Sequence, residues 1–424
     1  MTRIPLSRSY LNTPWPIAAF NVMSKPGGAG CNLACEYCFY KHNQRSREPE
    51  DRSQNGTCSS AMSDAPLEQF VAEYIAAQDN PTVFFAWQGG EPTLAGLDFY
   101  RRVIALQQKH ARKGVTISNA LQTNGVLLDE QWCQFLKEHD WAVGISIDGP
   151  ADIHDAYRRT RSGAGSYASV RQAIELLHKH NIHFDTLTTI TPANVNRVEE
   201  LYEFIMRELR PNVAQFQPCV ERKDHTTVAP GHWPAETLLT VGDERLRPGH
   251  PDSIMTDWSI SAEDWGNFLC QVFDLWWQRD RQGTPINWFH SWASQFAGGS
   301  ALMCICSPIC GRSVSMEKDG SVYSCDHFVY PEYKLGVADG KTGQTLSDLV
   351  RSQRQKQFGE AKSRNLPGYC KHCPFLQVCF GECPKRRFTK TPDGEPGLNY
   401  LCPGLRLFYH HAGSRLAEYG HQLR

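Results

Sequence analysis

Short runs of apolar and β-branched residues alternate, in the first half of the chain, with longer segments whose apolar residues recur every three or four positions. The short runs predict strands, and the periodic segments predict amphipathic helices. We expect the strands at residues 17–23, 83–87, 115–121, 142–148, 186–190 and 213–217. We expect the helices at residues 66–78, 96–110, 129–137, 166–180 and 194–209, the last capped by Asn194.

This alternation determines the fold class that we expect. Repeated βα units form a parallel sheet with helices outside it, because the right-handed crossover returns each strand to the same sheet. Six units without two more favour an α/β fold with a partial barrel. We therefore assign residues 1–230 to this core, 231–300 to a linker and bridging helical region, and 301–424 to a C-terminal domain.

The middle of the chain carries a weaker pattern. Residues 221–261 contain scattered Pro, Gly and charged residues, which is typical of a long excursion or linker. Residues 262–281 then place Trp265, Phe268 and Phe273 on a predicted amphipathic helix. Large rings pack in cores more often than they bind a cofactor, so we expect a packing helix.

Three polar fragments each follow a predicted strand at its carboxyl end. They are Gly-Gly-Glu-Pro at residues 89–92, Gln-Thr-Asn-Gly at residues 122–125 and Ser-Ile-Asp-Gly-Pro at residues 146–150. The carboxyl ends of parallel strands meet at one edge of the sheet, where ligand sites form in α/β proteins. We therefore expect the functional site at this edge.

Charge and hydropathy exclude several kinds of partner. Lys and Arg number 44 against 45 for Asp and Glu, so no overall field favours nucleic acid or an anionic membrane. The short basic run at residues 385–387 is interpreted as a solvated edge. No apolar stretch approaches the ~20 residues that span a bilayer, and residues 1–10 lack the apolar core of a secretory signal. We expect a soluble, cytoplasmic protein.

The 16 cysteines add chemistry to this picture. In a reducing cytosol, such thiols are metal ligands more often than disulfides. Cys31, Cys35 and Cys38 form the pattern C-x3-C-x2-C, which covers three irons of a [4Fe–4S] cube and leaves the fourth open to bind and reduce a small molecule. A zinc ion with a remote fourth ligand is the alternative. Nine of the cysteines lie between residues 304 and 402 and predict a second metal-binding module.

The triplet, with Tyr37 inside it and Phe39 and Tyr40 after it, resembles the signature of radical S-adenosylmethionine (SAM) enzymes. The resemblance implies a (β/α)6 barrel whose open iron chelates the amino and carboxylate groups of SAM. It also implies that an electron from the cluster splits SAM into methionine and a 5′-deoxyadenosyl radical.

The same resemblance implies roles for residues at the mouth of the barrel. Gly90 contacts the methionine ammonium of SAM through its backbone, while Glu91 fixes the loop. Ser146 lies near the ribose or methionyl end of SAM, and Tyr37 contributes to adenine binding. The guanidinium of Arg158 suits the SAM carboxylate, because its fork donates two parallel hydrogen bonds.

Arg158 also has a purely structural interpretation. An ion pair with Asp148 or Asp155 would engage the same guanidinium. Gln122 is a further candidate at the barrel mouth, since its amide both donates and accepts and could hold the backbone of a peptide substrate.

The C-terminal cysteines carry a second resemblance. Their spacing, C-x2-C-x5-C-x3-C followed by one more cysteine, resembles the SPASM module of peptide-modifying radical SAM enzymes. It implies two fully ligated auxiliary [4Fe–4S] clusters, and therefore three clusters in all. One quartet would be Cys304, Cys310, Cys325 and Cys383, and the other Cys370, Cys373, Cys379 and Cys402. Cys306 could replace Cys304, and a pair of structural zinc sites is the alternative to the clusters.

Asp326 directly follows Cys325, so its carboxylate is held where it can take a proton as an electron leaves the substrate. This pair and the cysteine spacing around it are similar to the anaerobic sulfatase-maturating enzymes. The similarity implies oxygen-independent oxidation of a sulfatase cysteine or serine to Cα-formylglycine, with Asp326 as general base. It implies an unfolded sulfatase polypeptide as substrate and reduced flavodoxin or ferredoxin as electron donor. A turn or cap is the structural alternative for Asp326.

Three other functions compete with this one. A SPASM enzyme that cross-links a ribosomal peptide through a thioether would share every cysteine, but such enzymes often carry a peptide-binding domain before the barrel. Here about 16 residues precede the first predicted strand, too few for a folded domain. A polyferredoxin that only relays electrons would need a fourth cysteine near residues 31–38. A zinc scaffold protein would show no brown colour on anaerobic purification.

Overall fold

The computed structural model describes residues 19–42, 61–341 and 343–423. Its centre is a set of six parallel strands that lie side by side in chain order, which confirms the partial barrel. The first strand begins at Asn21, where its pairing with a neighbour begins, and not at residue 17; residues 17 and 18 lie outside the described residues. The strands are β1 (Asn21–Lys25), β2 (Thr82–Trp87), β3 (Thr116–Thr123), β4 (Ala142–Ser146), β5 (Phe184–Ile190) and β6 (Ala214–Pro218).

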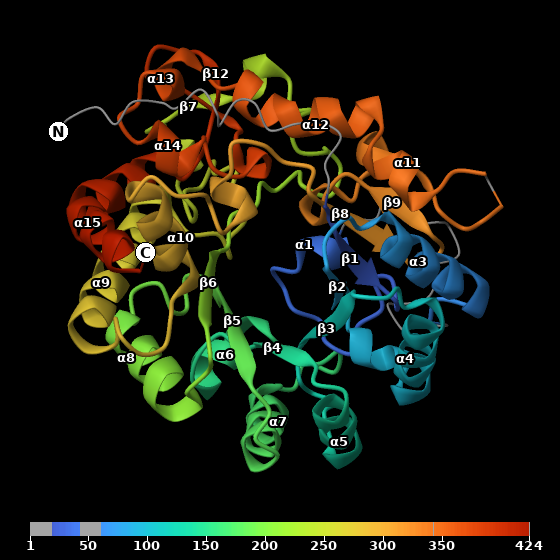
Figure 1. Ribbon diagram of the computed structural model, residues 1–424. Helices are drawn as coiled ribbons and strands as arrows, with labels where there is room; N and C mark the ends of the chain where they lie inside the picture. Colours follow the sequence, from blue (N-terminus) through green and yellow to red (C-terminus); the bar gives the residue numbers. More distant parts are fainter. Residues whose placement is uncertain (1–18, 43–60, 342, 424) are drawn as a thin grey trace.

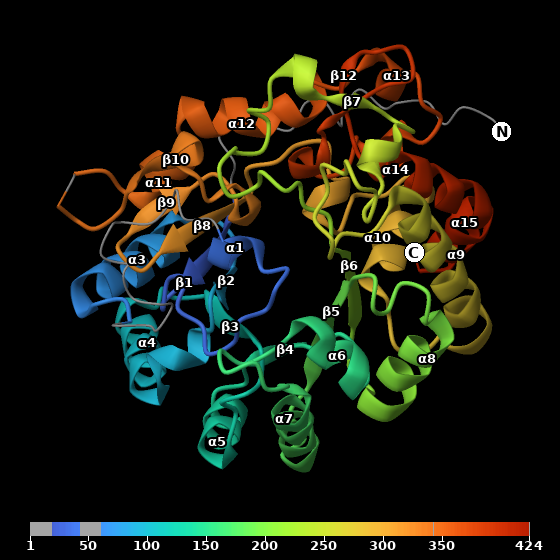
Figure 2. The ribbon, with the colours of Figure 1, turned by 180° about the vertical axis from the view of Figure 1, so that it is seen from behind.

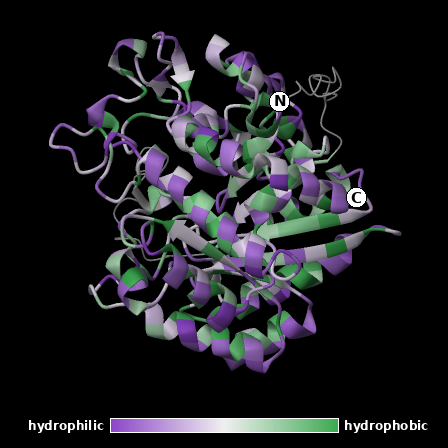
Figure 3. Ribbon diagram, turned by 90° about the vertical axis from the view of Figure 1, so that its left-hand side faces the viewer, coloured by the Kyte–Doolittle hydropathy of each residue, from purple (hydrophilic) through white to green (hydrophobic). Residues whose placement is uncertain are grey.

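The helices of the βα units cover the outside of the barrel (Figure 1). Hydrophobic and hydrophilic residues alternate along the helices, as Figure 3 shows, because each helix buries one face against the sheet. The helices are α3 (Asp64–Ala77), α4 (Leu97–His110), α5 (Glu130–Glu138), α6 (Ala151–Tyr157), α7 (Tyr167–Lys179) and α8 (Val198–Glu203). Of these, α6 has no counterpart among the predicted helices.

The helix predicted at residues 194–209 is shorter than expected and starts differently. Asn194 does not cap it, because its Nδ2 donates instead to the carbonyl oxygens of Asp148 and Thr189, each at 2.9 Å. The α-helix ends at Glu203, and the chain continues as a π-helical segment over Phe204–Leu209. The asparagine side chain donates hydrogen bonds to these buried carbonyl oxygens, which need a donor because water cannot reach them.

The barrel sheet continues beyond β1 into the C-terminal part of the chain. β8 (Ser313–Glu317) pairs with β1 in parallel, and β9 (Ser321–Tyr323) and β10 (Lys334–Val337) follow it in antiparallel arrangement. The result is one sheet of nine strands in the order β10-β9-β8-β1-β2-β3-β4-β5-β6. The C-terminal cysteine-rich region therefore shares a sheet with the core (Figure 2).

The segment predicted as an excursion or linker, residues 221–261, is fastened to the C-terminal part. Within it β7 (Leu239–Thr240) pairs in parallel with β11 (Thr389–Lys390), which also pairs with β12 (Pro396–Leu398). The hydroxyl of Tyr400 donates to the carbonyl oxygen of Ile260 at 3.0 Å. These contacts hold the segment against the cysteine-rich region.

Three helices form a compact layer beside β6: α9 (Ala262–Arg279), α10 (Asn287–Phe296) and α15 (Cys402–Gln422). Two of them approach so closely that a side-chain carbon on Gly404 would lie 1.8 Å from the carbonyl oxygen of Ala262. The predicted aromatic helix is α9, and its Trp265 and Phe273 are buried, which confirms the packing role. No helix in the described part of the chain is long and apolar enough to cross a membrane. The other α-helices of the described residues are α1 (Phe39–His42), α11 (Leu346–Val350), α12 (Gln353–Arg364), α13 (Gly368–Lys371) and α14 (Leu376–Cys379).

Candidate active site

A large cavity opens at the carboxyl ends of the barrel strands. Its volume is about 1090 Å³, including space open to solvent. The lining comes from the loop after β1, from the ends of β2 to β6, and from two segments of the cysteine-rich region. The structure brings together here the site residues predicted for the core, namely Cys31, Cys35, Cys38, Tyr37, Gly90, Ser146 and Arg158.

The three cysteines of the first motif lie together at one side of this cavity. Burial raises the pKa of the Cys31 thiol to about 12 and that of the Cys35 thiol to about 11. Neighbouring thiolates repel one another, so three ionised cysteines here require a bound cation such as the iron of a cluster. The backbone N–H of Leu33 lies 3.4 Å from the Cys31 sulfur, which is an orientation suited to a thiolate ligand. The loop therefore fits an iron–sulfur cluster.

The glycine-rich loop after β2 lies directly against the cysteine loop. Gly90 has a φ of +49°, and a side-chain carbon there would lie 2.1 Å from the carbonyl oxygen of Gly30. Only glycine permits this approach of two backbones. Gly90 also lines the cavity, so its backbone is available for contact with a ligand.

Glu91 holds this loop to the end of β3. Its carboxylate accepts hydrogen bonds from Thr93 Oγ1 and Thr123 Oγ1, each at 2.6 Å, and from the backbone N–H of Asn124 at 2.8 Å. Burial raises the pKa of Glu91, and these hydrogen bonds act in the opposite direction. The prediction that Glu91 fixes the loop is confirmed.

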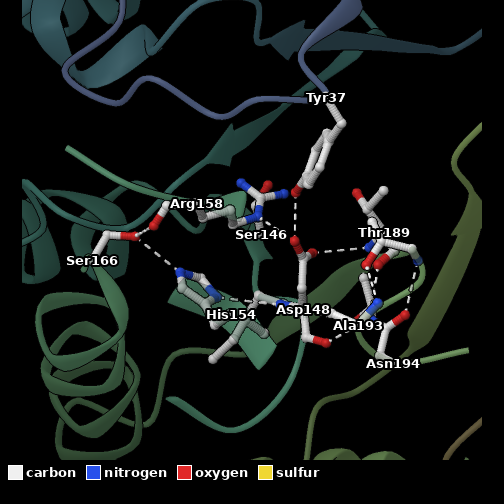
Figure 4. Close-up of polar contacts among 12 residues, drawn as sticks. Tyr37, Ser146, Asp148, His154, Arg158, Ser166, Thr189, Ala193 and Asn194 are labelled. Atoms are coloured by element: carbon white, nitrogen blue, oxygen red, sulfur yellow. Dashed lines mark hydrogen bonds and ion pairs between the residues drawn. The ribbon is translucent and has the colours of Figure 1, made fainter. Parts of the chain in front are cut away.

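Asp148, two residues after the end of β4, is the centre of the polar network in Figure 4. Its Oδ2 accepts from the Tyr37 hydroxyl at 2.5 Å and from Arg158 Nε at 2.9 Å, while its Oδ1 accepts from the Thr189 N–H at 2.9 Å. Of the two carboxylates considered for Arg158, the structure selects Asp148. Asp155 instead accepts from two backbone N–H groups at the start of α7.

His154 links the Asp148 backbone to Ser166 and so extends this network. Its Nδ1 accepts from the Asp148 N–H at 3.3 Å, so the ring proton sits on Nε2 and donates to Ser166 Oγ at 3.0 Å. The Ser166 hydroxyl in turn donates to the carbonyl oxygen of Arg158 at 2.8 Å. Burial lowers the pKa of His154 to about 4, which keeps the ring neutral as this chain of donors requires.

Gln122 and Ser146 meet on the cavity wall. Gln122 Nε2 donates to Ser146 Oγ at 3.2 Å, and both side chains line the cavity. The Gln122 amide oxygen lies close to Gly144. A side-chain carbon on Gly144 would lie 2.1 Å from Gln122 Oε1. The amide is therefore held in one orientation.

Asp326 lies in the turn after β9 and forms an ion pair with Lys25 of β1, whose Nζ is 2.5 Å from Oδ1. Burial opposes ionisation of Asp326, but the nearby Lys25, His327 and Lys385 together outweigh it and lower the pKa of the carboxyl below its ordinary value. Asp326 is not one of the residues that line the large cavity, but the next residue, His327, lines it and packs edge-on against the Phe39 ring. Sequence reasoning missed Lys25, although a lysine at the end of a buried strand is an unusual residue.

The first predicted quartet of C-terminal cysteines comes together. Burial raises the pKa of the Cys325 thiol, and the neighbouring thiols of Cys304, Cys383 and Cys310 raise it further. Cys306 is buried near Cys379 of the second quartet, while Lys362 lies near both Cys304 and Cys306. The choice of Cys304 rather than Cys306 as the ligand stays a prediction.

The second quartet lines a cavity of its own. Its volume is about 420 Å³, and Cys370, Cys373, Cys379 and Cys402 all face it. Four thiols around a small, mostly apolar cavity suit a fully ligated [4Fe–4S] cube. Each cysteine in the described ranges is a free thiol, so the sulfurs are available as ligands.

The interpretation of residues 385–387 as a solvated edge is wrong. Lys385 and Arg386 are buried and line the large cavity. Lys385 forms an ion pair with Glu221, and its Nζ lies 4.1 Å from the centre of the Phe39 ring. Arg386 pairs with Glu382 at 2.5 Å. The nearness of Cys383, an implied ligand, was the available signal that this run faces the site.

Comparison with known proteins supports the assignment of both regions. A family model for the radical SAM superfamily matches residues 26–205, and one for an iron–sulfur cluster-binding domain, SPASM, matches residues 306–374. The chain is 42% identical to the serine-type anaerobic sulfatase-maturating enzyme of Bacteroides thetaiotaomicron, over 92% of this chain and 88% of that protein. It is 30% identical to the cysteine-type enzyme of Clostridium perfringens, over 95% and 99%.

Solved structures show the same likeness. Histidine-tagged anSMEcpe with bound AdoMet superposes with a TM-score of 0.78 at 29% identity, covering 95% of this chain and 96% of that one. Native anSMEcpe with bound AdoMet and the Cp18Cys peptide gives a TM-score of 0.77 at 29% identity, covering 95% and 99%.

Proposed function

The chain belongs to the anaerobic sulfatase-maturating enzymes, radical SAM proteins that convert a sulfatase cysteine or serine to Cα-formylglycine, and we propose that its large cavity binds SAM and the target side chain together, with Asp326 as general base. The observation that carries this proposal is the meeting of the three-cysteine loop, the Gly90 loop and the Asp148–Arg158 pair around one cavity.

The cavity wall offers complementary groups for each end of SAM. The backbone of Gly90 is exposed for the methionine ammonium, and the Arg158 guanidinium is available for the carboxylate. Because Asp148 engages Nε, the two Nη groups of Arg158 are those that would meet the carboxylate. Ser146 and Tyr37 are proposed to contact the ribose and the adenine. SAM bound beside a reduced cluster supplies a 5′-deoxyadenosyl radical that takes one hydrogen atom from Cβ of the target residue.

The chain's own part in the oxidation is the removal of a proton. The target residue loses a hydrogen atom from Cβ, a proton from its thiol or hydroxyl, and one electron. Lys25 and the neighbouring His327 and Lys385 lower the pKa of Asp326, so its carboxylate is ionised and can accept the proton. A serine target then yields the aldehyde directly, whereas a cysteine target yields a thioaldehyde whose hydrolysis releases hydrogen sulfide.

Two further clusters are proposed in the cysteine-rich region. Cys304, Cys310, Cys325 and Cys383 would hold one, and Cys370, Cys373, Cys379 and Cys402 the other. With the first motif this makes three [4Fe–4S] clusters. The quartet that includes Cys325 adjoins Asp326, so the electron and the proton would leave the substrate toward the same region of the protein.

The partners follow from this chemistry. The substrate is proposed to be an unfolded sulfatase polypeptide, as the peptide complex of anSMEcpe supports. A reduced flavodoxin or ferredoxin is proposed as the electron donor, and the cytoplasm as the location, where thiols stay reduced.

The test is an anaerobic assay of the reconstituted protein with SAM, dithionite and a sulfatase-motif peptide carrying cysteine or serine at the target position. Peptide mass and 5′-deoxyadenosine are followed together. Asp326→Asn is assayed beside wild type, with Asp243→Asn as a matched control, because Asp243 forms a surface ion pair with Arg245.

We expect formylglycine in step with 5′-deoxyadenosine in the wild type and in Asp243→Asn, and at least a tenfold loss of formylglycine in Asp326→Asn. Deoxyadenosine with an unmodified peptide would move the substrate to another peptide. A protein with full iron content that cleaves no SAM would contradict the proposal.

A further inference from the structure

Lys25 is a buried cation in the core of the protein. Only 2% of its side chain is exposed, and it lies at the end of β1, six residues before the first cysteine ligand. A buried ammonium is costly unless it is paired, because it loses its hydration. Its partner is Asp326, which lies about 300 residues away along the chain and on the other domain.

The contact leaves part of the Asp326 side chain accessible. Lys25 Nζ lies 2.5 Å from Oδ1, and Oδ1 is fully buried. The Asp326 side chain as a whole is nevertheless 19% exposed, so its exposed surface is not on Oδ1. A carboxylate held through one oxygen presents the other oxygen in a single direction, which suits the transfer of a proton from a substrate.

Lys25 also contacts both loops that form the SAM site. Its stem packs on the glycine-rich loop, so that a side-chain carbon on Gly89 would lie 2.4 Å from Lys25 Cγ. Its ammonium lies 3.5 Å from the centre of the Tyr40 ring, in the helix that follows the cysteine loop. The Tyr40 hydroxyl donates in turn to Glu317 of β8 at 2.6 Å. Lys25 is thus the point where the glycine loop, the cysteine loop and Asp326 meet.

We propose that Lys25 is a positioning residue that holds the Asp326 carboxylate in place beside the loops that form the SAM site. This inference rests on the proposed role of Asp326 as general base. The ammonium holds the carboxylate at a fixed place relative to the two loops that Lys25 contacts. Loss of the ammonium would release the base but would leave the cysteine loop and the SAM-contacting groups in place.

Lys25→Met tests this, because methionine keeps most of the buried stem and removes the charge. Lys25→Met, Asp326→Asn and the double variant are compared with wild type as cluster-loaded proteins. Lys109→Met is the matched control, since Lys109 forms an exposed ion pair with Glu68 at 2.6 Å. The readouts are formylglycine formed per 5′-deoxyadenosine, the iron content, and the EPR signal of the reduced cluster with and without SAM.

We expect Lys25→Met to retain wild-type iron content, EPR signal and SAM cleavage within about twofold, and to lose formylglycine at least tenfold. The double variant should be no worse than Asp326→Asn alone, because Lys25 acts through that carboxylate. Lys109→Met should match wild type.

Other outcomes would overturn the inference. If iron content, SAM cleavage and formylglycine fall together in Lys25→Met, the lysine only supports the fold or the SAM site. If the losses in the double variant multiply, Lys25 acts independently of Asp326. Absence of formylglycine from the wild type would overturn the proposed function, and the inference with it. If the wild type and Asp326→Asn behave as proposed but Lys25→Met does not, only the role of Lys25 is overturned.

Discussion

Arg158 and Asp148 form a buried ion pair in which Nε lies 2.9 Å from Oδ2, with 9% and 3% of the two side chains exposed. The carboxylate is fixed further by the Tyr37 hydroxyl and the Thr189 N–H. Such a pair does little for stability when it is intact, because both ions have lost their hydration. Its consequence here is orientation: the guanidinium points one way into the cavity where SAM is proposed to bind.

Asp148→Asn should therefore weaken SAM binding without removing a proposed SAM contact. The variant leaves the Arg158 charge buried without its counterion. Such a change typically lowers the free energy of unfolding by about 3–5 kcal/mol. We expect the Kd for SAM to rise at least tenfold, measured by the change in the EPR signal of the reduced cluster on titration. Asp152→Asn is the control, because Asp152 pairs with Arg197 at the surface of the same region and 64% of its side chain is exposed. Equal SAM affinity in both variants would contradict the orienting role.

Gly90→Ala should abolish SAM cleavage and loosen the first cluster. A side-chain carbon at position 90 would lie 2.1 Å from the Gly30 carbonyl oxygen, and the backbone has a positive φ, so the two loops must separate. Iron content and 5′-deoxyadenosine formation measure the effect. In Gly283→Ala the nearest neighbour atom is 3.5 Å away, so this control should retain both. A fully active Gly90→Ala would show that the loops do not approach in this way.

Acid should weaken the protein through His154. Its folded-state pKa is lowered to about 4 by burial, whereas an unfolded histidine titrates near its ordinary value of 6.5. The pKa of His154 is lower in the folded than in the unfolded state. The contribution of this group to the free energy of unfolding is therefore fully present above the unfolded-state pKa, and it is lost as the pH falls from there toward the folded-state pKa. Between about pH 7.5 and pH 5 this group should cost about 2 kcal/mol of unfolding free energy.

The measurement is anaerobic denaturant unfolding of the cluster-loaded protein at both pH values. His154→Asn keeps an acceptor near the Asp148 N–H but cannot titrate, so its unfolding free energy should fall less on acidification. Equal acid sensitivity in the two proteins would assign the pH dependence to other groups.

Cys304→Ala and Cys306→Ala should differ sharply, although the two residues are only two positions apart. The thiol of Cys304 lies with those of Cys325, Cys310 and Cys383, so its loss should remove one whole cluster, about four irons per chain. Cys306 is buried beside Trp292, and its truncation should leave the iron content unchanged at a cost of about 1 kcal/mol in stability. Iron analysis and Mössbauer spectroscopy distinguish the two. Loss of iron from Cys306→Ala alone would reverse the ligand assignment.

The sequence by itself determined the features that depend on near neighbours in the chain. The six βα units are visible because helices and strands have different apolar periods. The cysteine triplet and the C-terminal block are recognisable because a cluster requires thiols at short, definite spacings. The loop of Gly90 and Glu91 could be placed at the cavity because the carboxyl ends of parallel strands meet at one edge.

Only the tertiary structure decided the contacts between distant segments. Nothing in the local pattern of residues 313–317 indicates that β8 lies in parallel beside β1, because such pairing is set by packing of the whole chain. The burial of Lys385 and the choice of Asp148 over Asp155 as partner of Arg158 have the same origin. The ion pair of Lys25 and Asp326 is the clearest case, since a charge is tolerated in the core only where folding brings its counterion to it.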